Sequence, residues 1–328
     1  MAVILGCDGF DNGTIKVSGS NQSGQVSAST DAEGRKTGPY CLKLGTNGWV
    51  RYAVTGTPAN CSTSFWVQIG VDVYTYDRTK IQFILSTGEA IELRWDPTNK
   101  TFDAYVAGVK VADGTVFLPS RTIFHVQFYA VIADAGSIGV KINGFTSISY
   151  SGDTLPVGAA AAVSYVKFFN DVNDIGIYFD DIVWGTGGFL GDLRCVDIRP
   201  NADTIQDDWT PSAGDNYSTI DETPASDADY NVTNVNANAD QLALGDFDGV
   251  TYTPRATIAW VRARMEGATG DSIKVGIVSN AVASVTESAL STSYEYYFHT
   301  NDKNPDGTVA WTDAAIDALL LRYEAVIA

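Results

Sequence analysis

Side chains that commonly carry out catalysis are sparse in this sequence of 328 residues. Its two histidines, His125 and His299, each lie in a strand-like pattern without a neighbouring Ser-x-Gly, cysteine or carboxylate motif, so we expect both to be packed or interface residues. The sequence has no nucleophile elbow, no Gly-x-x-x-x-Gly-Lys phosphate loop, no His-Glu-x-x-His zinc motif and no dinucleotide-binding fingerprint. These absences predict a protein that is not an enzyme.

Glycoside hydrolysis is the reaction that a β-rich chain with few motifs can still support. It needs two carboxylates about 5–10 Å apart on either side of one bond. Glu89 and Glu92 are the nearest pair, but residues three apart on a strand point to opposite faces of the sheet. An endoglycanase therefore stays a third alternative, which requires a carboxylate pair on one sheet face.

Two acidic segments offer oxygen ligands for calcium. Asp8 and Asp11 lie in the opening segment, and Asp180 and Asp181 lie near the end of the first half. Calcium takes about six to eight oxygens, which these segments supply only jointly, and the first and last strands of a sandwich often lie side by side. We predict calcium as a candidate ligand of these aspartates, with solvated turn acids as the alternative.

Aromatic residues are abundant, with seven tryptophans and sixteen tyrosines. Exposed rings can stack on sugars as they do at other interfaces. Trp49 follows a glycine and Trp209 follows an aspartate near turns, so these two are the candidates for glycan binding, with packing as the alternative. Four others fall inside strand patterns and are expected in the core: Trp66, Trp95, Trp184 and Trp260.

Period-two alternation of apolar and polar residues predicts strands throughout the first half. Residues 64–74 are one such strand, residues 96–100 form a turn between two paired strands, and residues 124–133 pair with residues 138–142. Because two packed antiparallel sheets bury one face of every strand, we expect an all-β chain that begins with a jelly-roll β-sandwich.

Chain length and a glycine-rich passage after Trp184 predict two domains, 1–188 and 189–328. The second is expected to be a smaller β-domain with one short helix at residues 311–321, capped by Thr312 and Asp313. Residues 200–241 are so polar that we expect a long extended loop or an interface there.

The formal net charge is −18, and residues 191–328 carry 22 acidic and 8 basic side chains. With no visible cluster of basic residues, we expect no nucleic acid partner. No apolar run is long enough for membrane insertion, and the opening residues do not read as a targeting segment, so we expect a soluble protein made in the cytoplasm. The four cysteines show no Cys-x-x-Cys spacing and are expected to be free thiols.

Residues at both ends of the first half follow a known pattern. The chain opens with Cys7-Asp8-Gly9-Phe10-Asp11, and residues 177–184 read Ile-Tyr-Phe-Asp-Asp-Ile-Val-Trp. The first half thereby resembles the concanavalin-like (laminin G-like) jelly roll, in which an opening strand pairs with a closing Phe-Asp-Asp-Ile strand.

Three segments of the second half form another pattern: residues 208–217 (Asp-Trp-Thr-Pro-Ser-Ala-Gly-Asp-Asn-Tyr), residues 220–224 (Ile-Asp-Glu-Thr-Pro) and residues 310–319 (Ala-Trp-Thr-Asp-Ala-Ala-Ile-Asp-Ala-Leu). These segments are similar to those of a family of tailed-bacteriophage virion proteins, described as tail or minor structural proteins. The turn at residues 299–303 is longer than in that pattern, and the cysteines are not part of it.

This resemblance implies a non-enzymatic structural protein of the virion, a tail, fibre-base or surface-decoration component that acts in particle assembly and host attachment. Its partners would be other virion proteins and further copies of itself, with a trimer as the first expectation. Trp209, Tyr217 and Trp311 would belong to the assembly interface. The alternative is a lectin-like module that recognises bacterial surface glycan, and both roles can hold for one attachment protein.

Overall fold

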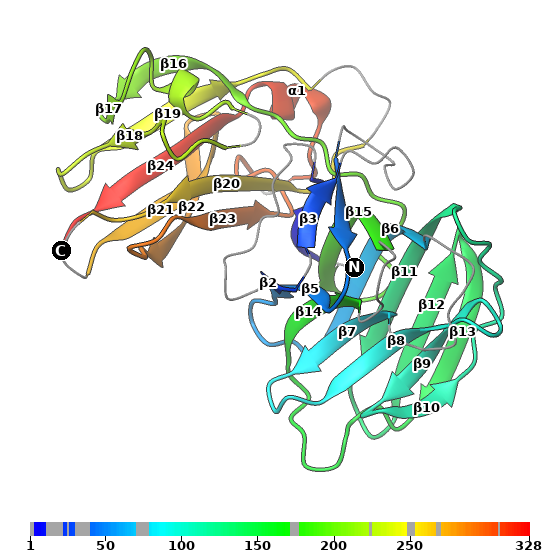
Figure 1. Cartoon of the computed structure of the whole chain (residues 1–328). Coiled ribbons are helices and arrows are strands. Elements are labelled where there is room, and N and C mark those ends of the chain that lie inside the picture. Colours follow the sequence, from blue (N-terminus) through cyan, green and yellow to red (C-terminus); the bar gives the residue numbers. More distant parts are fainter. Residues whose placement is uncertain are drawn as a thin grey trace. The chain divides into compact units, whose positions relative to one another are not determined.

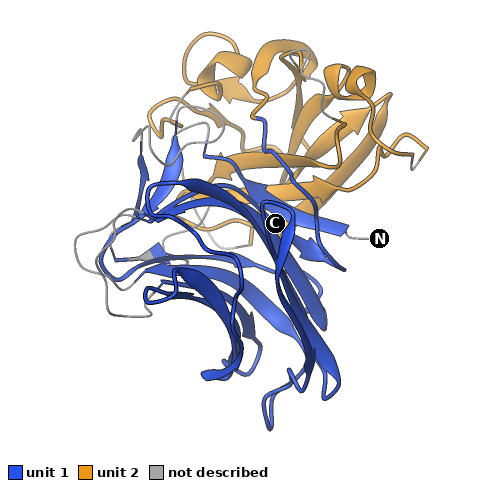
Figure 2. Cartoon of the chain, turned by 90° about the vertical axis from the view of Figure 1, so that its right-hand side faces the viewer, with its two compact units in different colours: residues 1–196 blue, residues 197–328 orange. Residues whose placement is uncertain are grey.

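The computed structural model describes residues 3–10, 22–24, 26–29, 40–69, 79–170, 177–222, 225–247, 253–266, 270–307 and 309–328. They form two compact units, residues 1–196 and 197–328, which Figure 2 shows in different colours. The regular secondary structure of both units is almost entirely strand, as the sequence predicts. The boundary predicted after Gly188 falls a few residues before the division at Val196. The residues between them belong to unit 1 because the amides of Gly191 and Cys195 donate hydrogen bonds to Gln127 and Asp181 of that unit.

Unit 1 is a sandwich of two antiparallel sheets (Figure 1). The eight-stranded sheet has the order β13-β12-β11-β6-β15-β4-β3, and β1 also pairs with β15. Its strands are β1 (Val3–Asp8), β3 (Val26–Ser29), β4 (Cys41–Leu44), β6 (Asn60–Ile69), β11 (Ile123–Val131), β12 (Gly136–Ile142), β13 (Phe145–Gly152) and β15 (Ile177–Thr186).

The seven-stranded sheet has the order β10-β9-β8-β7-β14-β5-β2. Its strands are β2 (Gln22–Ser23), β5 (Gly48–Ala53), β7 (Thr79–Leu85), β8 (Ala90–Asp96), β9 (Thr101–Val106), β10 (Val109–Ala112) and β14 (Val163–Asn170).

The core of unit 1 lies between these sheets and consists of every second residue of their strands. Phe83 of β7 stacks on Phe128 of β11 with ring centroids 4.3 Å apart, and Phe65 meets Phe168 edge to face at 5.2 Å. Each fully buried phenylalanine contributes roughly 1.5–3 kcal/mol. Because strand side chains alternate between faces, filling this core also fixes which residues point outward.

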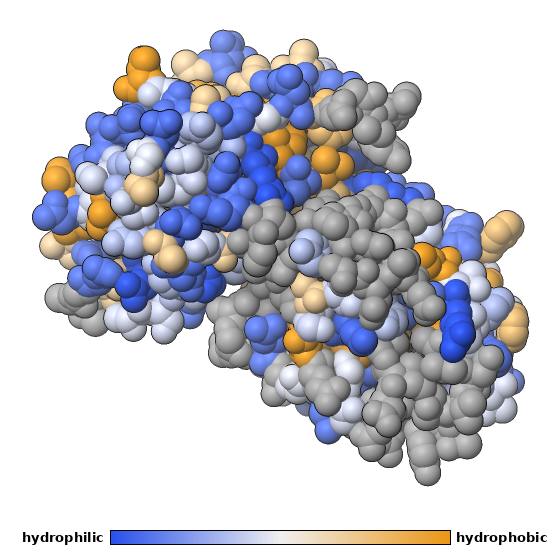
Figure 3. All heavy atoms as spheres, turned by 45° about the horizontal axis from the view of Figure 1, so that its top comes forward, coloured by the Kyte–Doolittle hydropathy of each residue, from blue (hydrophilic) through white to orange (hydrophobic). Residues whose placement is uncertain are grey.

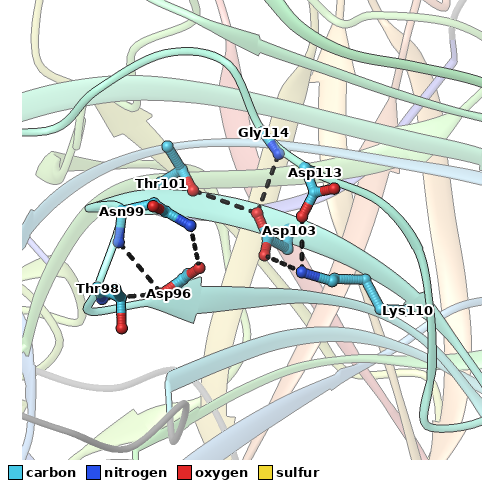
Figure 4. Close-up of polar contacts among 8 residues, drawn as sticks. All are labelled: Asp96, Thr98, Asn99, Thr101, Asp103, Lys110, Asp113 and Gly114. Atoms are coloured by element: carbon cyan, nitrogen blue, oxygen red, sulfur yellow. Dashed lines mark hydrogen bonds and ion pairs between the residues drawn. The ribbon is translucent and has the colours of Figure 1, made fainter.

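Several sequence predictions are confirmed in unit 1. The first and last strands pair, with Asp8 opposite Ile182, and the strands predicted at residues 124–133 and 138–142 pair as β11 and β12. The turn at residues 96–100 joins β8 and β9. Asp96 shapes this turn by accepting hydrogen bonds from the backbone amides of Thr98 and Asn99 (Figure 4). Of the strand predicted at 64–74, residues 70–74 lie outside the described residues.

Two of the four tryptophans expected in the core are found elsewhere. Trp95 and Trp184 are buried between the sheets, but Trp66 points out of β6, where its ring lies between His125 and Arg194. Trp260 is half-buried on the outward side of a two-stranded sheet in unit 2. The alternation of apolar and polar residues predicted these strands correctly, but the side chains of Trp66 and Trp260 point to the outward face of their sheets and not to the core.

Unit 2 has a five-stranded sheet of order β16-β19-β24-β21-β22 and two two-stranded sheets, β17-β18 and β20-β23. Its elements are β16 (Pro200–Asp207), β17 (Thr210–Pro211), the 3-10 helix η2 (Tyr217–Thr219), β18 (Asn231–Val232), β19 (Ala239–Leu244), β20 (Thr257–Ala263), β21 (Ser272–Ser279), β22 (Val282–Ala289), β23 (Glu295–Asn301), α1 (Asp313–Asp317) and β24 (Leu320–Val326).

The predicted helix at residues 311–321 is correct at its start and wrong at its end. The side chain of Thr312 caps α1 by accepting from the amide of Ala315 at 3.2 Å. The helix ends at Asp317, however, because Leu320 and Leu321 already belong to β24, which pairs with β19 and β21 in the sheet. Long-range strand pairing has overridden the local helical pattern.

The polar segment 200–241, predicted as an extended loop or an interface, begins in β16 and ends in β19, and side chains hold the mostly irregular backbone between these strands. The carboxylate of Asp240 is fully buried. One of its oxygens accepts from the amides of Asp208 (2.8 Å) and Trp209 (2.9 Å), and the other from the side chains of Asn216 (2.7 Å) and Tyr323 (2.6 Å). We call Asp240 and these four partners the Asp240 hub.

Hydrophilic side chains cover most of the face of unit 2 that Figure 3 turns toward the viewer, in keeping with its acidic composition. Among the described residues, no helix has the length and apolarity needed to cross a membrane.

Candidate functional site

The outward side of the seven-stranded sheet gathers charged and aromatic residues in two rows. Val50, Phe83, Leu93 and Phe168 are fully buried in the core, so their neighbours in the same strands point the opposite way. Strand register aligns these outward residues across the sheet. The first row is Arg51, Lys167, Gln82, Glu92, Tyr105 and Lys110, and the second is Trp49, Phe169, Lys80, Arg94 and Asp103. We call this surface the two-row face.

Cations lie against aromatic rings at one side of the two-row face, on β5 and β14. The guanidinium of Arg51 lies 4.4 Å from the ring centroid of Tyr165 and 5.5 Å from that of Trp49. The ammonium of Lys167 lies 4.8 Å from the Trp49 ring and 5.3 Å from the Phe169 ring. These distances suit cation–π attraction, which holds the long side chains along the sheet.

Ion pairs organise the centre of the two-row face, on β7, β8 and β9. Glu92 accepts from Arg94 at 2.6 Å and lies 3.9 Å from the ammonium of Lys80. Arg94 in turn lies 4.0 Å from the ring centroid of Tyr105. The Glu92 side chain is only 9% exposed, and those of Arg94 and Lys80 are 15% and 26% exposed. The side chains at this part of the face are therefore largely shielded from solvent and held in place by one another.

Lys167 has the most unfavourable electrostatic position on the two-row face. Its half-buried side chain lies directly across from Arg51 in the neighbouring strand. Burial lowers the pKa of Lys167 below its usual value, and the positive charges of Arg51 and Lys80 lower it further, while Glu92 opposes them. Among the residues that the structure describes, no carboxylate lies within ion-pair distance of its ammonium.

The far edge of the two-row face is fixed by Asp103 (Figure 4). This buried carboxylate accepts from the amide of Gly114 (3.0 Å), the hydroxyl of Thr101 (3.2 Å) and the ammonium of Lys110 (3.3 Å). Lys110 also bonds Asp113 at 2.6 Å. Asp103 thus ties the segment after β10 to β9, and its oxygens are fully engaged in structure.

The sequence prediction that basic residues form no cluster is wrong for this face. Arg51, Lys80, Arg94 and Lys167 come together because β5 and β14, and β7 and β8, are paired. The local signal that was missed is an i, i+2 spacing of rings and cations within single strands, as in Trp49-x-Arg51 and Tyr165-x-Lys167-x-Phe169. Only the pairing of distant strands shows that these spacings belong to one surface.

The outward residues of β6 and β11 in the eight-stranded sheet, in contrast, are covered by the chain itself. The amides of Gly187 and Gly191 donate to the side chains of Asn60 (2.7 Å) and Gln127 (2.8 Å), and the Phe189 ring packs edge-on against Tyr129 with centroids 4.7 Å apart. We call residues 187–196 the covering segment.

His125 is part of the surface on which the covering segment lies. Its Nε2 atom lies 2.7 Å from Ser64 Oγ, and the Ser64 hydroxyl donates to the carbonyl of Gly191 at 2.9 Å. Burial lowers the pKa of His125, Asp192 opposes that shift and Arg194 adds to it. The packed role that the sequence predicts for His125 agrees with this setting. In unit 2, His299 lies among the side chains of Ser284, Thr286 and Asn301, and burial lowers its pKa as well.

The predicted ring residues have different environments. Trp49 lies on the two-row face, opposite Phe169 and beside Arg51, and its part in glycan binding stays a prediction. Trp209 packs against Tyr323 with centroids 5.1 Å apart and donates its indole N–H to the carbonyl of Asn238 at 3.1 Å. Tyr217 packs against the core of unit 2, and Trp311 is only 3% exposed. Packing inside unit 2 accounts for Trp209, Tyr217 and Trp311, so their predicted part in an interface stays a prediction.

The aspartates predicted to bind calcium are partly brought together. Asp8, Asp180 and Asp181 are fully buried near the pairing of β1 with β15. Asp8 accepts from the Tyr52 hydroxyl at 3.2 Å, and Asp181 accepts from the amide of Cys195 and lies 3.6 Å from Arg194. Asp11 lies outside the described residues. Within the described part of the chain, no group of three metal-ligating side chains is found, so calcium binding stays a prediction.

No protein-family model and no curated protein matches the sequence. Several solved structures are similar to part of the chain. The cellulose-induced protein Cip1 is 16% identical over 58% of this chain and 99% of that chain, with a TM-score of 0.43. An endo-β-1,4-glucuronan lyase from the fungus Trichoderma reesei is 13% identical over 56% of this chain and 96% of its own, with a TM-score of 0.42. A carbohydrate esterase of a Shiga toxin-encoding bacteriophage is 16% identical over 57% of this chain and 100% of its own, with a TM-score of 0.42. With identities this low and TM-scores below 0.5, these similarities carry no argument about function.

Proposed function

We propose that unit 1 is a glycan-binding module whose ligand lies across the two-row face. The observation that carries this proposal is the alignment of rings with charged side chains across neighbouring strands, on a sheet whose other face forms the core. Sugars offer apolar ring faces for stacking and hydroxyls for hydrogen bonds, and the two-row face offers partners for both. From β5 to β9 the rows span roughly 19 Å, at about 4.8 Å per strand, which suits an extended oligosaccharide.

We propose binding without cleavage, because the carboxylates of this face are already engaged. Glu92 and Asp103 lie on neighbouring strands and on the same side of the sheet, which meets the same-face requirement for an endoglycanase. Hydrolysis, however, needs one carboxyl group to give a proton and the other to reach the sugar or a water. Glu92 is bound to Arg94, and Asp103 is bound to Gly114, Thr101 and Lys110.

The proposal is tested with the full-length chain and a panel of soluble polysaccharides: dextran, hydroxyethyl cellulose, polygalacturonate and hyaluronan. Retardation in affinity gels ranks the panel, and calorimetry then measures the affinity for the best ligand. We expect Phe169→Ala to weaken binding about tenfold, which is 1.4 kcal/mol and the size of one ring contact.

The matched control is Phe145→Ala, since Phe145 is a 73% exposed ring on the other sheet. Its affinity should equal that of the unsubstituted chain, and reducing ends should not accumulate with any variant. Wild-type affinity of a folded Phe169→Ala variant, or no retardation by any polymer, would contradict the proposal.

A role in a phage particle rests on the sequence resemblance, and so do the expected virion partners and the trimer. Light-scattering mass of the full chain tests self-association, because a defined trimer would support that role and a monodisperse monomer would count against it. Glycan binding and virion assembly are compatible, so this measurement leaves the proposal for unit 1 unaffected.

A further inference from the structure

We infer that the ligand of the two-row face is an acidic polysaccharide, whose anionic groups bind beside Arg51, Lys167 and Lys80. This inference rests on the proposed function and names the class of its ligand.

The first support is a cluster of positive charge in a chain whose net charge is strongly negative. The net charge is −18, yet four cations occupy facing positions on four neighbouring strands: Arg51 lies opposite Lys167 and Lys80 opposite Arg94. Like charges that face each other across a sheet destabilise it. A fold that keeps them together has an arrangement suited to a negatively charged partner.

The second support is the environment of Lys167, whose ammonium has no carboxylate within ion-pair distance among the described residues. Glu92 forms ion pairs with both Arg94 and Lys80, and Asp103 forms one with Lys110 at the far edge. The half-buried ammonium of Lys167 contacts rings on β5 and β14. A carboxylate or sulfate placed here would offset the charge of Lys167, and a neutral sugar would not.

The third support is the chemistry of the neighbouring side chains. Arg51 can offer a planar pair of donors to a carboxylate, and Lys167 a compact charge beside it. Gln82 lies next to Lys167 in the same row and can bond sugar hydroxyls. The rings of Trp49, Phe169 and Tyr165 can stack on sugar faces. Single-stranded nucleic acid also stacks on rings, but its denser charge is repelled more strongly by a chain with a net charge of −18.

The test compares each acidic polymer with its own uncharged form. Polygalacturonate and hyaluronan are used directly and after carbodiimide–borohydride reduction of their carboxylates, and dextran sulfate tests whether sulfate can replace carboxylate. Calorimetry with the full chain is run at 50 mM and 300 mM NaCl, and a single-stranded oligothymidylate is titrated in parallel. We expect at least one carboxylated polymer to bind about tenfold or more tightly than its reduced form, and to weaken with salt.

Variants locate the effect on the two-row face. Lys167→Gln and Arg51→Gln should each lower affinity for the acidic polymer about tenfold, and should leave affinity for the reduced polymer unchanged. Lys141→Gln is the matched control, because Lys141 also lies against a ring, that of Phe189 at 4.5 Å, but on the other sheet. It should behave as the unsubstituted chain.

The outcomes separate this inference from the proposed function. If reduced or neutral polymers bind as tightly as acidic ones, or if Lys167→Gln has no effect, the ligand class is wrong and glycan binding stands. If no polymer of either kind binds, both fail. Tighter binding of oligothymidylate than of any acidic polysaccharide would overturn the inference in favour of a nucleic acid ligand.

Discussion

Replacing Asp240 by asparagine should destabilise the polar segment of unit 2 and increase its local opening. Asp240→Asn keeps the shape of the side chain and turns one carboxylate oxygen into an N–H donor. One oxygen can still accept from the amides of Asp208 and Trp209. The new amide then faces Asn216 and Tyr323, which both donate to Asp240 in the structure.

The expected cost follows from the two hydrogen bonds that are lost. Each joins a buried charged acceptor to a neutral donor, and such bonds contribute about 1.5–3 kcal/mol. Together they give about 3–6 kcal/mol, a large part of the roughly 5–15 kcal/mol by which a domain is stable. Since about 1.4 kcal/mol corresponds to a factor of ten, amide exchange through opening of this region should quicken by roughly two to four orders of magnitude.

Native-state hydrogen exchange with mass spectrometry measures this effect in the full-length chain. Peptides from β19 and β24 report on the Asp240 hub, and peptides from β11 in unit 1 serve as an internal reference. Asp246→Asn is the control, because Asp246 is exposed. Tyr323→Phe removes one of the same bonds, so the two substitutions should be non-additive by about 1.5–3 kcal/mol in a double-mutant cycle.

A result within about 0.5 kcal/mol of the unsubstituted chain, the range of ordinary surface changes, would refute this account of the Asp240 hub. The segment around Trp209 and Tyr217 would then need another explanation, and the interface predicted from the sequence would gain support.

Two further predictions concern groups whose protonated, charged form is disfavoured by the folded state. Lys167→Met should raise the free energy of unfolding of unit 1 by roughly 0.2–1 kcal/mol at pH 7, the size of a like-charge contact across strands. It should also lower the affinity for glycan. Urea unfolding measures the first effect and calorimetry the second, with Lys141→Met as the control. Because the folded-state pKa of Lys167 is lowered, its charge disfavours the folded state at neutral pH, and the gain should shrink as pH rises through that pKa toward the unfolded value near 10.4. The pKa of His125 is lowered as well, mainly by burial, so the free energy of unfolding should fall as pH drops below about 6.5. His125→Asn should remove part of that loss. If the variant and the unsubstituted chain lose the same stability as pH falls below about 6.5, this prediction is wrong.

The strands of unit 1 that could be predicted are those that signal themselves locally, whereas β5 and β13 were not predicted. The alternation around Phe65 and the turn that begins at Asp96 depend on residues within one or two strands, and the structure confirms both. The capping threonine at the start of α1 was equally local.

What the sequence could not show depends on contacts between distant residues. Arg51 and Lys167 face each other only because β5 pairs with β14, so a cluster of cations on one face was invisible in a linear reading. The end of α1 is set in the same way by the pairing of β24 with two partners. The polar composition of residues 200–241 predicted a loop, since composition does not show that Asp240 would supply acceptors for its amides.

The covering segment determines how a pulling force would pass through unit 1. The chain leaves this unit along the outward side of the eight-stranded sheet, where Asn60 and Gln127 hold it. The two-row face lies on the opposite side of the sandwich. A force that pulls a ligand bound on the two-row face away from the rest of the chain would therefore act across the roughly 10 Å between the two sheets. Both sheets, and the aromatic rings packed between them, would resist this force together.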